Sequence, residues 1–248
     1  MTKINQLVSN WPKGTVKTVN ELRKLGYTPQ LLKVYSNSKW IESVVGGMYK
    51  LYHDDINWQG VLYGLQKKNN TTIHAGGKTA LVLKGYGHYL SSTEGRAYLF
   101  SDRKENFSVW LSKFKNVVLK RNEVFDYKEE KYFIMFNTGN FQIKISSPEL
   151  AAMEMLYLVP QEQSFDEAAK IMEGLATLRP AIIQDLLQHC NSVKVKRLFL
   201  FMAENYDHPW MKELNLENIN LGSGKRSIVT DGVLNKKYNL TVPREYAK

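Results

Sequence analysis

Gln30, Lys33 and Asn37 share one face of a predicted helix, and their side chains are suited to contacts with DNA bases. Residues three and four positions apart lie on the same side of an α-helix. Glutamine and asparagine can contact adenine through two hydrogen bonds, and lysine can reach guanine or a phosphate. The spacing predicts a helix that lies in the major groove. The alternative is that Gln30 and Asn37 only solvate a surface helix.

Basic side chains surround this helix in the sequence. The first 53 residues contain eight lysines and arginines against two glutamates, a net charge of +6 out of +10 for the whole chain. A compact basic segment of this kind is typical of a nucleic-acid-binding domain. We expect the following residues to lie at its interface with DNA, in addition to the three named above: Lys13, Lys17, Thr28, Lys39 and Lys50.

Capping signals near the N-terminus predict the helices that would position these side chains. Thr18 and Glu21 form a capping box, in which each side chain satisfies a backbone amide at the start of a helix. Thr28 caps the next helix, and Pro29 occupies its first position, where a missing amide costs nothing. The core side of this helix is expected to be Leu31, Val34 or Tyr35, and Ser38.

A hairpin is predicted directly after these helices. β-branched and aromatic residues lie on either side of Gly46-Gly47, which is a two-residue turn signal. An N-terminal helix, a capped helix, a glycine turn, a second capped helix and a hairpin follow one another within the first 53 residues. This order predicts a winged helix-turn-helix, with the hairpin as its wing.

The rest of the sequence alternates between helical and strand patterns. Residues 55–90 are predicted to be helical around a short β-like segment, and residues 96–146 to form strands. Helices are expected next, and Asp231-Gly232 predicts a hairpin turn between two strands near the C-terminus. The fold class expected from these patterns is α+β.

Two domains are expected from the change in charge and pattern along the chain. Residues 1–90 are predicted to be the winged helix-turn-helix DNA-binding domain, with its basic core at residues 1–53. Residues 91–248 are predicted to form a mixed α/β domain.

A second group of cations lies near the C-terminus. Lys194 and Arg197 are three positions apart in a predicted helix, and Lys225 and Arg226 belong to a GSGKR turn. Together they could attract acidic groups of a protein or the phosphates of RNA or nucleotides. The alternative is that they are solubilising charges on ordinary surface.

The sequence gives no positive evidence for an enzyme. Gly-Lys pairs at residues 77–78 and 224–225 lack the glycine that a phosphate loop needs five positions before the pair. Cys190 is the only cysteine and is expected to pack in the core. Carboxylates between Asp102 and Glu154 make a metal-dependent nuclease worth testing, although solvated turns explain them better. We therefore expect no catalytic residue, no metal and no cofactor.

The chain carries no apolar stretch that could cross a membrane and no signal peptide, so a cytoplasmic protein without a membrane partner is expected.

Several long segments resemble the AbiEi antitoxins of bacterial abortive-infection toxin–antitoxin systems. The segments are WQGVLYGLQ (residues 58–66), IHAGGKTALVLKGYGHYL (73–90) and LGSGKRSIVTDGVLNKKYNLTVP (221–243), and the likeness also takes in the N-terminal helices. The resemblance implies a winged-helix domain that binds inverted repeats in its own promoter and represses the operon. It also implies a C-terminal domain that counters a nucleotidyltransferase toxin, in the type IV class, where a stable complex with the toxin is not required.

One position departs from the family pattern. Members often carry a basic residue at the tip of the wing, whereas this chain has Val45-Gly46-Gly47. Two expectations follow for this wing: it contacts phosphate through Lys50 and backbone amides, or it contributes little to binding.

Two other functions are compatible with the sequence. One is a DNA-binding protein with a nuclease-like C-terminal domain. The other is an interaction module whose basic end, residues 178–248, docks on an acidic protein.

Overall fold

The computed structural model describes residues 2–87 and 95–247, in two compact units. The first unit comprises residues 1–75, 94–121 and 135–145, and the second unit comprises residues 76–93, 122–134 and 146–248. The expected domain boundary, between residues 90 and 91, lies outside the described residues.

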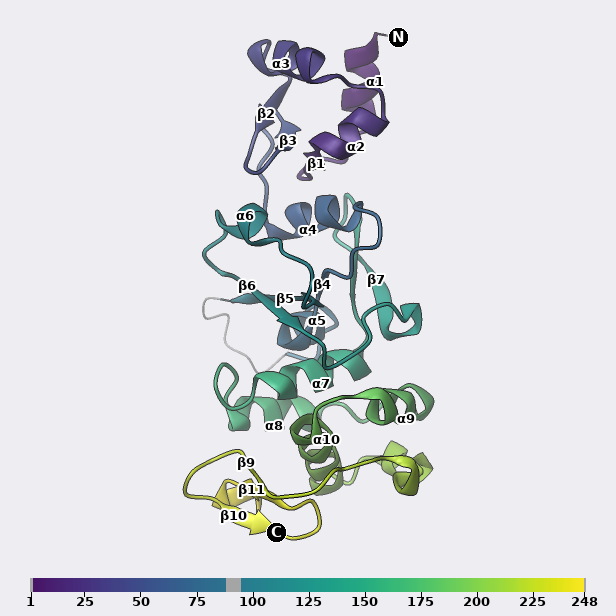
Figure 1. The fold of residues 1–248 in the computed structure, drawn as a ribbon, viewed down its shortest axis with the longest axis vertical. Helices are drawn as coiled ribbons and strands as arrows, with labels where there is room; N and C mark the ends of the chain where they lie inside the picture. The colour runs from purple at the N-terminus through teal and green to yellow at the C-terminus, as the bar shows by residue number, and fades with distance from the viewer. Residues whose placement is uncertain (1, 88–94, 248) are drawn as a thin grey trace. The chain divides into compact units, whose positions relative to one another are not determined.

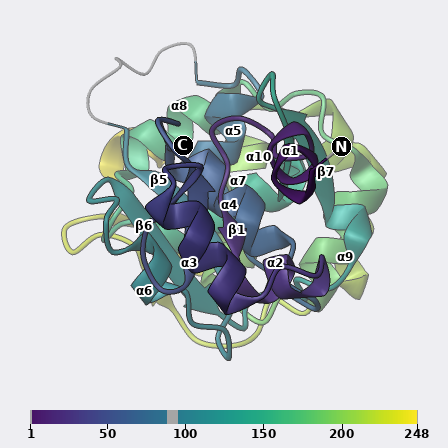
Figure 2. The same ribbon diagram turned by 90° about the horizontal axis from the view of Figure 1, so that it is seen from above.

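The N-terminal part of the first unit combines three helices with a small antiparallel sheet (Figure 1). The sheet has the strand order β1-β3-β2, and in both views the three helices gather beside it (Figures 1 and 2). The elements in chain order are α1 (Lys3–Ser9), β1 (Lys17–Thr18), α2 (Val19–Lys24), α3 (Pro29–Asn37), β2 (Ile41–Ser43) and β3 (Met48–Leu51).

Side-chain caps fix where α2 and α3 begin. The Thr18 hydroxyl accepts a hydrogen bond from the amide of Glu21 at 3.1 Å, and the Thr28 hydroxyl accepts one from the amide of Leu31 at 3.3 Å. Both caps confirm the prediction from the sequence. The prediction that the Glu21 carboxylate accepts a hydrogen bond from a backbone amide at the start of α2 is wrong, because this carboxylate pairs with Lys17 instead.

A single apolar core holds this part together. It is built from Leu7, Trp11, Leu22, Tyr27, Leu32, Tyr35, Ile41 and Leu51. From α3 it takes Leu32 and Tyr35, whereas Val34 is 56% exposed. Of the two alternatives expected for the core side of α3, Tyr35 is therefore confirmed and Val34 is not. Leu31 packs against the core as expected, whereas the prediction was wrong at Ser38, which is exposed.

Helix α4 (Trp58–Gln66) lies directly against the segment that precedes β1. A Cβ atom on Gly60 would meet the carbonyl oxygen of Gly14 at 1.8 Å, and one on Gly64 would meet the carbonyl oxygen of Val16 at 2.6 Å. Both positions therefore require glycine, and their spacing of four places them on the same face of α4.

A five-stranded sheet forms the rest of the first unit, with the order β6-β5-β4-β8-β7. Its middle strand β4 pairs antiparallel with β5 and parallel with β8, through Ala75 and Ile145. A short helix, α6 (Ser108–Leu111), follows β5. The strands are β4 (His74–Ala75), β5 (Ala97–Asp102), β6 (Val117–Asn122), β7 (Phe133–Asn137) and β8 (Gln142–Ser146).

Helices dominate the second unit. Helix α7 packs against α5, α10, α9 and α8, and nearly all of its residues are buried. The helices are α5 (Gly77–Leu83), α7 (Pro148–Leu158), α8 (Phe165–Glu173), α9 (Pro180–His189) and α10 (Val193–Asn205). Short 3-10 helices occupy Glu130–Tyr132, Pro209–Glu213, Leu216–Asn218 and Arg244–Tyr246.

A small C-terminal sheet completes this unit, with the order β10-β11-β9. Its strands are β9 (Arg226–Ser227), β10 (Val233–Asn235) and β11 (Leu240–Val242). The prediction of a hairpin turn at Asp231-Gly232 is wrong, because β9 and β10, the strands on either side of it, do not pair with each other. Strand β11 lies between them, parallel to β9 and antiparallel to β10. Gly232 instead allows a close approach, since a Cβ atom there would meet the carbonyl oxygen of Val242 at 2.3 Å.

Within residues 2–87 and 95–247, no helix has the length and apolar character needed to cross a membrane.

Candidate nucleic-acid interface

The outer face of α3 presents four side chains to solvent. Gln30, Lys33, Val34 and Asn37 are all exposed, at positions i, i+3, i+4 and i+7. Polar groups that could contact base edges are thus collected on one face. Val34 is the member that the sequence analysis missed, and its methyl groups could contact the methyl group of thymine.

Two further predicted residues lie exposed near this helix. Thr28 uses its hydroxyl as the α3 cap, so its role is to fix the start of the helix. Lys39 follows α3 with a left-handed backbone (φ 57°), and its ammonium lies 6.0 Å from the centre of the Tyr52 ring. Lys13 is exposed in the turn before β1.

Lys17 does not lie on a surface that DNA could reach. Its exposed fraction is 7%, its Nζ is 2.6 Å from Glu21 Oε1, and it lies over the ring of Trp11 at 5.7 Å. The expected phosphate contact is incompatible with this placement, because the ammonium already has a carboxylate partner inside the fold.

Lys50 is also engaged inside the first unit. Its Nζ donates to the carbonyl oxygen of Asp54 at 2.8 Å and lies 3.2 Å from the Glu42 carboxylate. Since Lys50 remains partly exposed, a phosphate would have to compete with these two partners.

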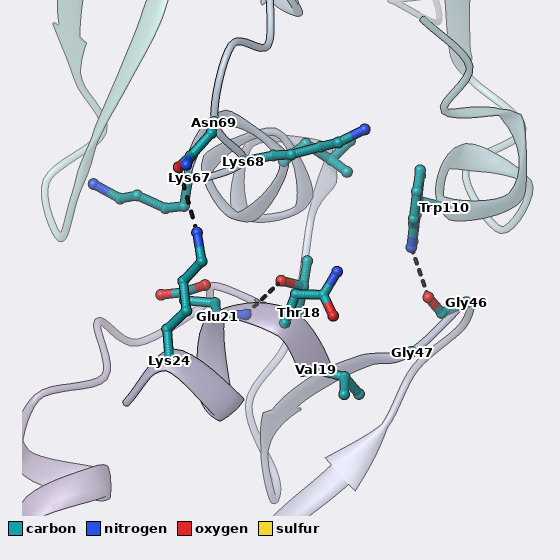
Figure 3. Close-up of a pocket in the computed structure, with 12 residues that line it drawn as sticks. Thr18, Val19, Glu21, Lys24, Gly46, Gly47, Lys67, Lys68, Asn69 and Trp110 are labelled. Carbon is teal, nitrogen blue, oxygen red and sulfur yellow. Dashed lines mark hydrogen bonds between the residues drawn. The ribbon is translucent and has the colours of Figure 1, made fainter. Parts of the chain in front are cut away.

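The hairpin turn between β2 and β3 is held by side chains from another part of the first unit. Trp110 Nε1 donates to the carbonyl oxygen of Gly46 at 2.8 Å (Figure 3). Lys113 Nζ donates to the carbonyl oxygen of Val44 at 2.6 Å. Neither residue was predicted from the sequence, since no local pattern connects them with a turn more than sixty positions earlier. These contacts anchor the turn to a later segment of the first unit.

Arg197 lies inside the second unit and not on its surface. Its exposed fraction is 3%, and its guanidinium donates to the carbonyl oxygens of Leu221, Gly222, Gly224 and Asn239 at 2.5–3.2 Å. Arg197 was predicted to lie on a working surface, and its burial contradicts this. Its guanidinium instead holds the GSGKR turn and the connection between β10 and β11 in place.

Lys194 is likewise used within the fold. Its Nζ donates to the carbonyl oxygens of Tyr157 at 2.8 Å and Val159 at 2.6 Å, and burial lowers the pKa of the side chain. Lys225 is exposed, and Arg226 is partly exposed, with one guanidinium nitrogen donating to the carbonyl oxygen of Lys225. Lys194 is also partly exposed, but its ammonium is occupied by two backbone carbonyl oxygens, so Lys225 and Arg226 are the two cations that the second unit leaves without such an anchor to distant backbone.

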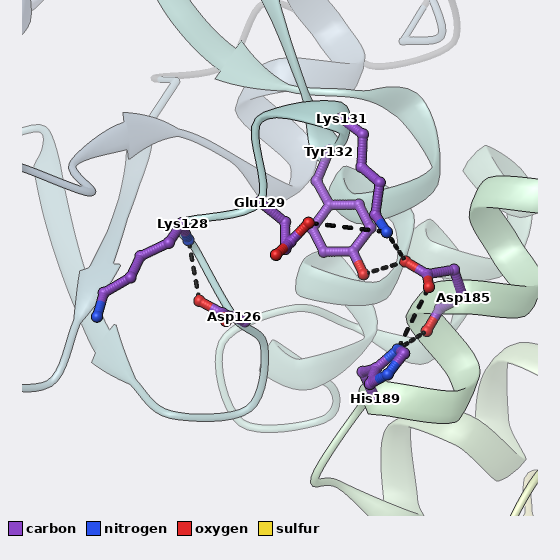
Figure 4. A network of polar contacts seen from close by, with 7 residues as sticks. All are labelled: Asp126, Lys128, Glu129, Lys131, Tyr132, Asp185 and His189. Atoms are coloured by element: carbon purple, nitrogen blue, oxygen red, sulfur yellow. Dashed lines mark hydrogen bonds and ion pairs between the residues drawn. The ribbon is translucent and has the colours of Figure 1, made fainter.

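A polar network in the second unit joins the segment before β7 to α9 (Figure 4). Asp185 accepts a hydrogen bond from the Tyr132 hydroxyl and forms an ion pair with Lys131 at 2.8 Å. Burial opposes the charge of Asp185, but the hydrogen bonds from Lys131 and Tyr132 outweigh it and lower the pKa of this carboxyl. Burial and the same carboxylate raise the pKa of Tyr132. The network thus keeps Asp185 charged and joins two segments.

The described residues contain no group of three or more His, Cys, Asp or Glu side chains that could hold a metal ion. Asp126 and Glu129 lie in solvated turns, where Asp126 accepts from the amide of Lys128 (Figure 4). Burial raises the pKa of the Cys190 thiol to about 11, which keeps the thiol protonated at neutral pH.

An exposed helix face with polar side chains and a lysine, within a segment of net positive charge, is typical of a nucleic-acid-binding domain. Residues 1–92 match the family model described as transcriptional regulator, AbiEi antitoxin N-terminal domain. Residues 94–243 match the one described as transcriptional regulator, AbiEi antitoxin, type IV toxin–antitoxin system. The chain belongs to the AbiEi antitoxin family, which confirms the resemblance seen in its sequence.

Among solved structures, that of the Rv2827c protein from Mycobacterium tuberculosis is similar to this chain. The two align with a TM-score of 0.62 at 12% sequence identity, over 96% of this chain and 88% of that chain. At this identity the likeness shows the fold alone. No curated protein matches the sequence.

Proposed function

We propose that residues 1–90 form a winged helix-turn-helix domain that binds inverted repeats in the promoter of its own operon and represses transcription. The exposed face of α3 carries this proposal, because Gln30, Lys33 and Asn37 present the donors and acceptors that base edges require. Lys13 and Lys39 add phosphate contacts beside it. The wing contributes less than in family members with a basic tip, since Trp110 and Lys113 hold its turn.

Fluorescence anisotropy with labelled promoter DNA and a scrambled duplex tests this assignment. Gln30→Ala and Lys33→Ala are each expected to cost about 1–3 kcal/mol on the promoter and to relax preference at single positions. With roughly five phosphate contacts, log K should fall against log salt with a slope of about −4 to −5. Lys104→Ala, an exposed lysine elsewhere in the first unit, is the matched control. Unchanged promoter affinity in both α3 variants would refute the assignment.

We further propose that residues 91–248 neutralise a cognate nucleotidyltransferase toxin without a stable complex, and that both partners act in the cytoplasm. Lys225 and Arg226 are the proposed working surface, because their charges remain exposed while Lys194 and Arg197 are occupied by backbone carbonyls. Acidic groups of the toxin, or phosphates that it handles, would be attracted to this pair.

The double variant Lys225→Gln/Arg226→Gln is expected to lose rescue of cells from the toxin and to keep promoter binding. Lys236→Gln/Lys237→Gln, on a neighbouring exposed turn of the same unit, is the control. Point variants are preferable to a fragment that starts at residue 91, because such a fragment lacks β4, the middle strand of the sheet. Full rescue by the double variant would assign neutralisation to another surface.

A further inference from the structure

A cavity of about 680 Å³ lies within the first unit, beside the turn that joins β2 and β3 (Figure 3). Its walls come from the start of α2, the turn at Gly46 and Gly47, the end of α4 with the residues that follow it, and Trp110. This volume is in the range of pockets that hold small-molecule ligands.

Three lysines give the cavity a positive charge. Lys24, Lys67 and Lys68 line it, and none of them forms an ion pair within the part of the chain that the structure describes. Lys67 and Lys68 lie instead over the rings of Tyr63 and Phe107, at 4.7 and 5.5 Å. The one acidic residue of the lining, Glu21, is already neutralised by Lys17.

The remainder of the lining combines polar side chains, from Thr18, Asn20 and Asn69, with apolar ones. Val19 and Leu65 contribute aliphatic surface, and Trp110 contributes an indole ring. The hydrogen bond from Trp110 Nε1 to Gly46 fixes the orientation of this ring. Figure 3 shows Trp110 and Lys67 on opposite sides of the cavity, with the Lys67 side chain extending away from Trp110 and the Lys68 side chain extending toward it. A ligand that combines a planar ring with negative charge suits this distribution.

We propose that this cavity binds a nucleotide, with its phosphates at Lys24, Lys67 and Lys68 and its base against Val19, Leu65 and Trp110. Ammonium groups without carboxylate partners can form charge-assisted hydrogen bonds to phosphate oxygens. A ring in contact with apolar walls adds the burial that a free phosphate lacks.

Occupancy of the cavity is coupled to the wing, because Gly46 and Gly47 form part of its wall. A nucleotide that contacts Trp110 and the turn changes the affinity of the domain for promoter DNA, and DNA changes the affinity for the nucleotide by the same factor. This coupling rests on the proposed function, whereas nucleotide binding itself does not.

Calorimetric titration of the full-length protein, without DNA, tests the site with ATP, GTP, CTP, UTP and inorganic pyrophosphate as probes. At least one nucleotide is expected to bind with one site per chain and more tightly than pyrophosphate. Lys67→Gln/Lys68→Gln removes both charges, keeps two methylene groups of each stem, and should weaken this binding at least tenfold. Arg103→Gln/Lys104→Gln, exposed in the same unit and outside the cavity lining, should leave it unchanged. Thermal melting confirms that each variant is folded.

The remaining outcomes overturn the proposal. The proposal is refuted if no nucleotide binds, or if pyrophosphate binds as tightly as the nucleotides. It is also refuted if the folded Lys67/Lys68 variant binds nucleotide as tightly as the wild-type protein. If that variant loses promoter affinity while the wild-type protein binds no nucleotide, the lysines belong to the DNA interface instead. Because the titration contains no DNA, its result does not depend on promoter binding, which the anisotropy experiment tests separately.

Discussion

Helices α3 and α10 both carry cations, but they use them in opposite ways. On α3, Lys33 lies on an exposed face beside Gln30 and Asn37. On α10, Arg197 and Lys194 donate to backbone carbonyl oxygens from distant parts of the second unit. A cation whose donors are satisfied inside the fold maintains structure, whereas one on an exposed face keeps its donors available for a ligand.

The difference follows from how much of each helix is buried. In α3 only Leu32 and Tyr35 are buried, so the opposite face is in water. In α10 every residue from Val195 to Ala203 is buried, so a charge there must find partners within the protein. The GSGKR turn supplies them as carbonyl oxygens.

The largest effect should come from removing the guanidinium of α10. Arg197→Ala leaves four carbonyl oxygens without their donor and is expected to lower the free energy of unfolding by about 3 kcal/mol or more. Arg197→Lys should recover part of this loss, because one ammonium cannot reach all four oxygens. Urea denaturation measures both. If Arg197→Ala unfolds at the same urea concentration as the wild-type protein, Arg197 does not stabilise the fold and the contrast between α10 and α3 is wrong.

An intermediate effect, with a pH dependence, is expected at Glu149. This buried carboxylate accepts three hydrogen bonds from Arg179 at 2.9 Å. Burial opposes its charge, but the hydrogen bonds outweigh burial and lower the pKa of Glu149. Its contribution to stability is therefore present above the unfolded pKa of about 4.3 and is lost as the pH falls through the lower folded pKa.

Glu149→Gln should lower the free energy of unfolding by about 2 kcal/mol at pH 7, and the deficit relative to wild type should shrink as the solution is acidified. Chemical denaturation at pH 7, 5 and 3 follows this convergence. A constant difference across these values would show that the charge of Glu149 is not what stabilises the pair. Promoter binding at neutral pH should stay unchanged, since Glu149 belongs to the interior of the second unit.

The smallest effects separate Lys17 from Lys39. Lys17→Gln should cost about 1 kcal/mol in stability through the lost pair with Glu21, with little effect on promoter affinity in the folded protein. Lys39→Gln should leave stability unchanged, weaken binding to all duplexes alike, and reduce the salt slope by about 1. Thermal melting and anisotropy measure the two quantities. The opposite pattern would place Lys17 on the DNA and Lys39 in the structure.

Local signals in the sequence predicted much of the N-terminal part. A hydroxyl residue before a helix acts within one turn, so the caps at Thr18 and Thr28 could be identified without the rest of the chain. The face that bears Gln30, Lys33 and Asn37 followed from helical spacing alone. The choice between Val34 and Tyr35 for the core stayed open, because helical spacing alone does not fix which apolar residues face the core.

The features that the sequence did not reveal depend on distant partners. The burial of Arg197 requires the GSGKR turn and Asn239, and the restraint of the wing requires Trp110. The parallel pairing of β9 with β11 likewise depends on the path of the chain between them, so the Asp231-Gly232 pattern was assigned to the wrong turn. Pattern and charge describe a residue's type, and tertiary contacts decide whether it is exposed.

Strand β4 has a consequence for how the protein is made. This two-residue strand occupies the middle of its sheet, and its parallel partner β8 comes much later in the chain. At synthesis rates of roughly 5–20 residues per second, several seconds separate the appearance of β4 from that of β8 at the ribosome. All residues of the three-helix core, the last of which is Leu51, have therefore been synthesised while the sheet still lacks β8.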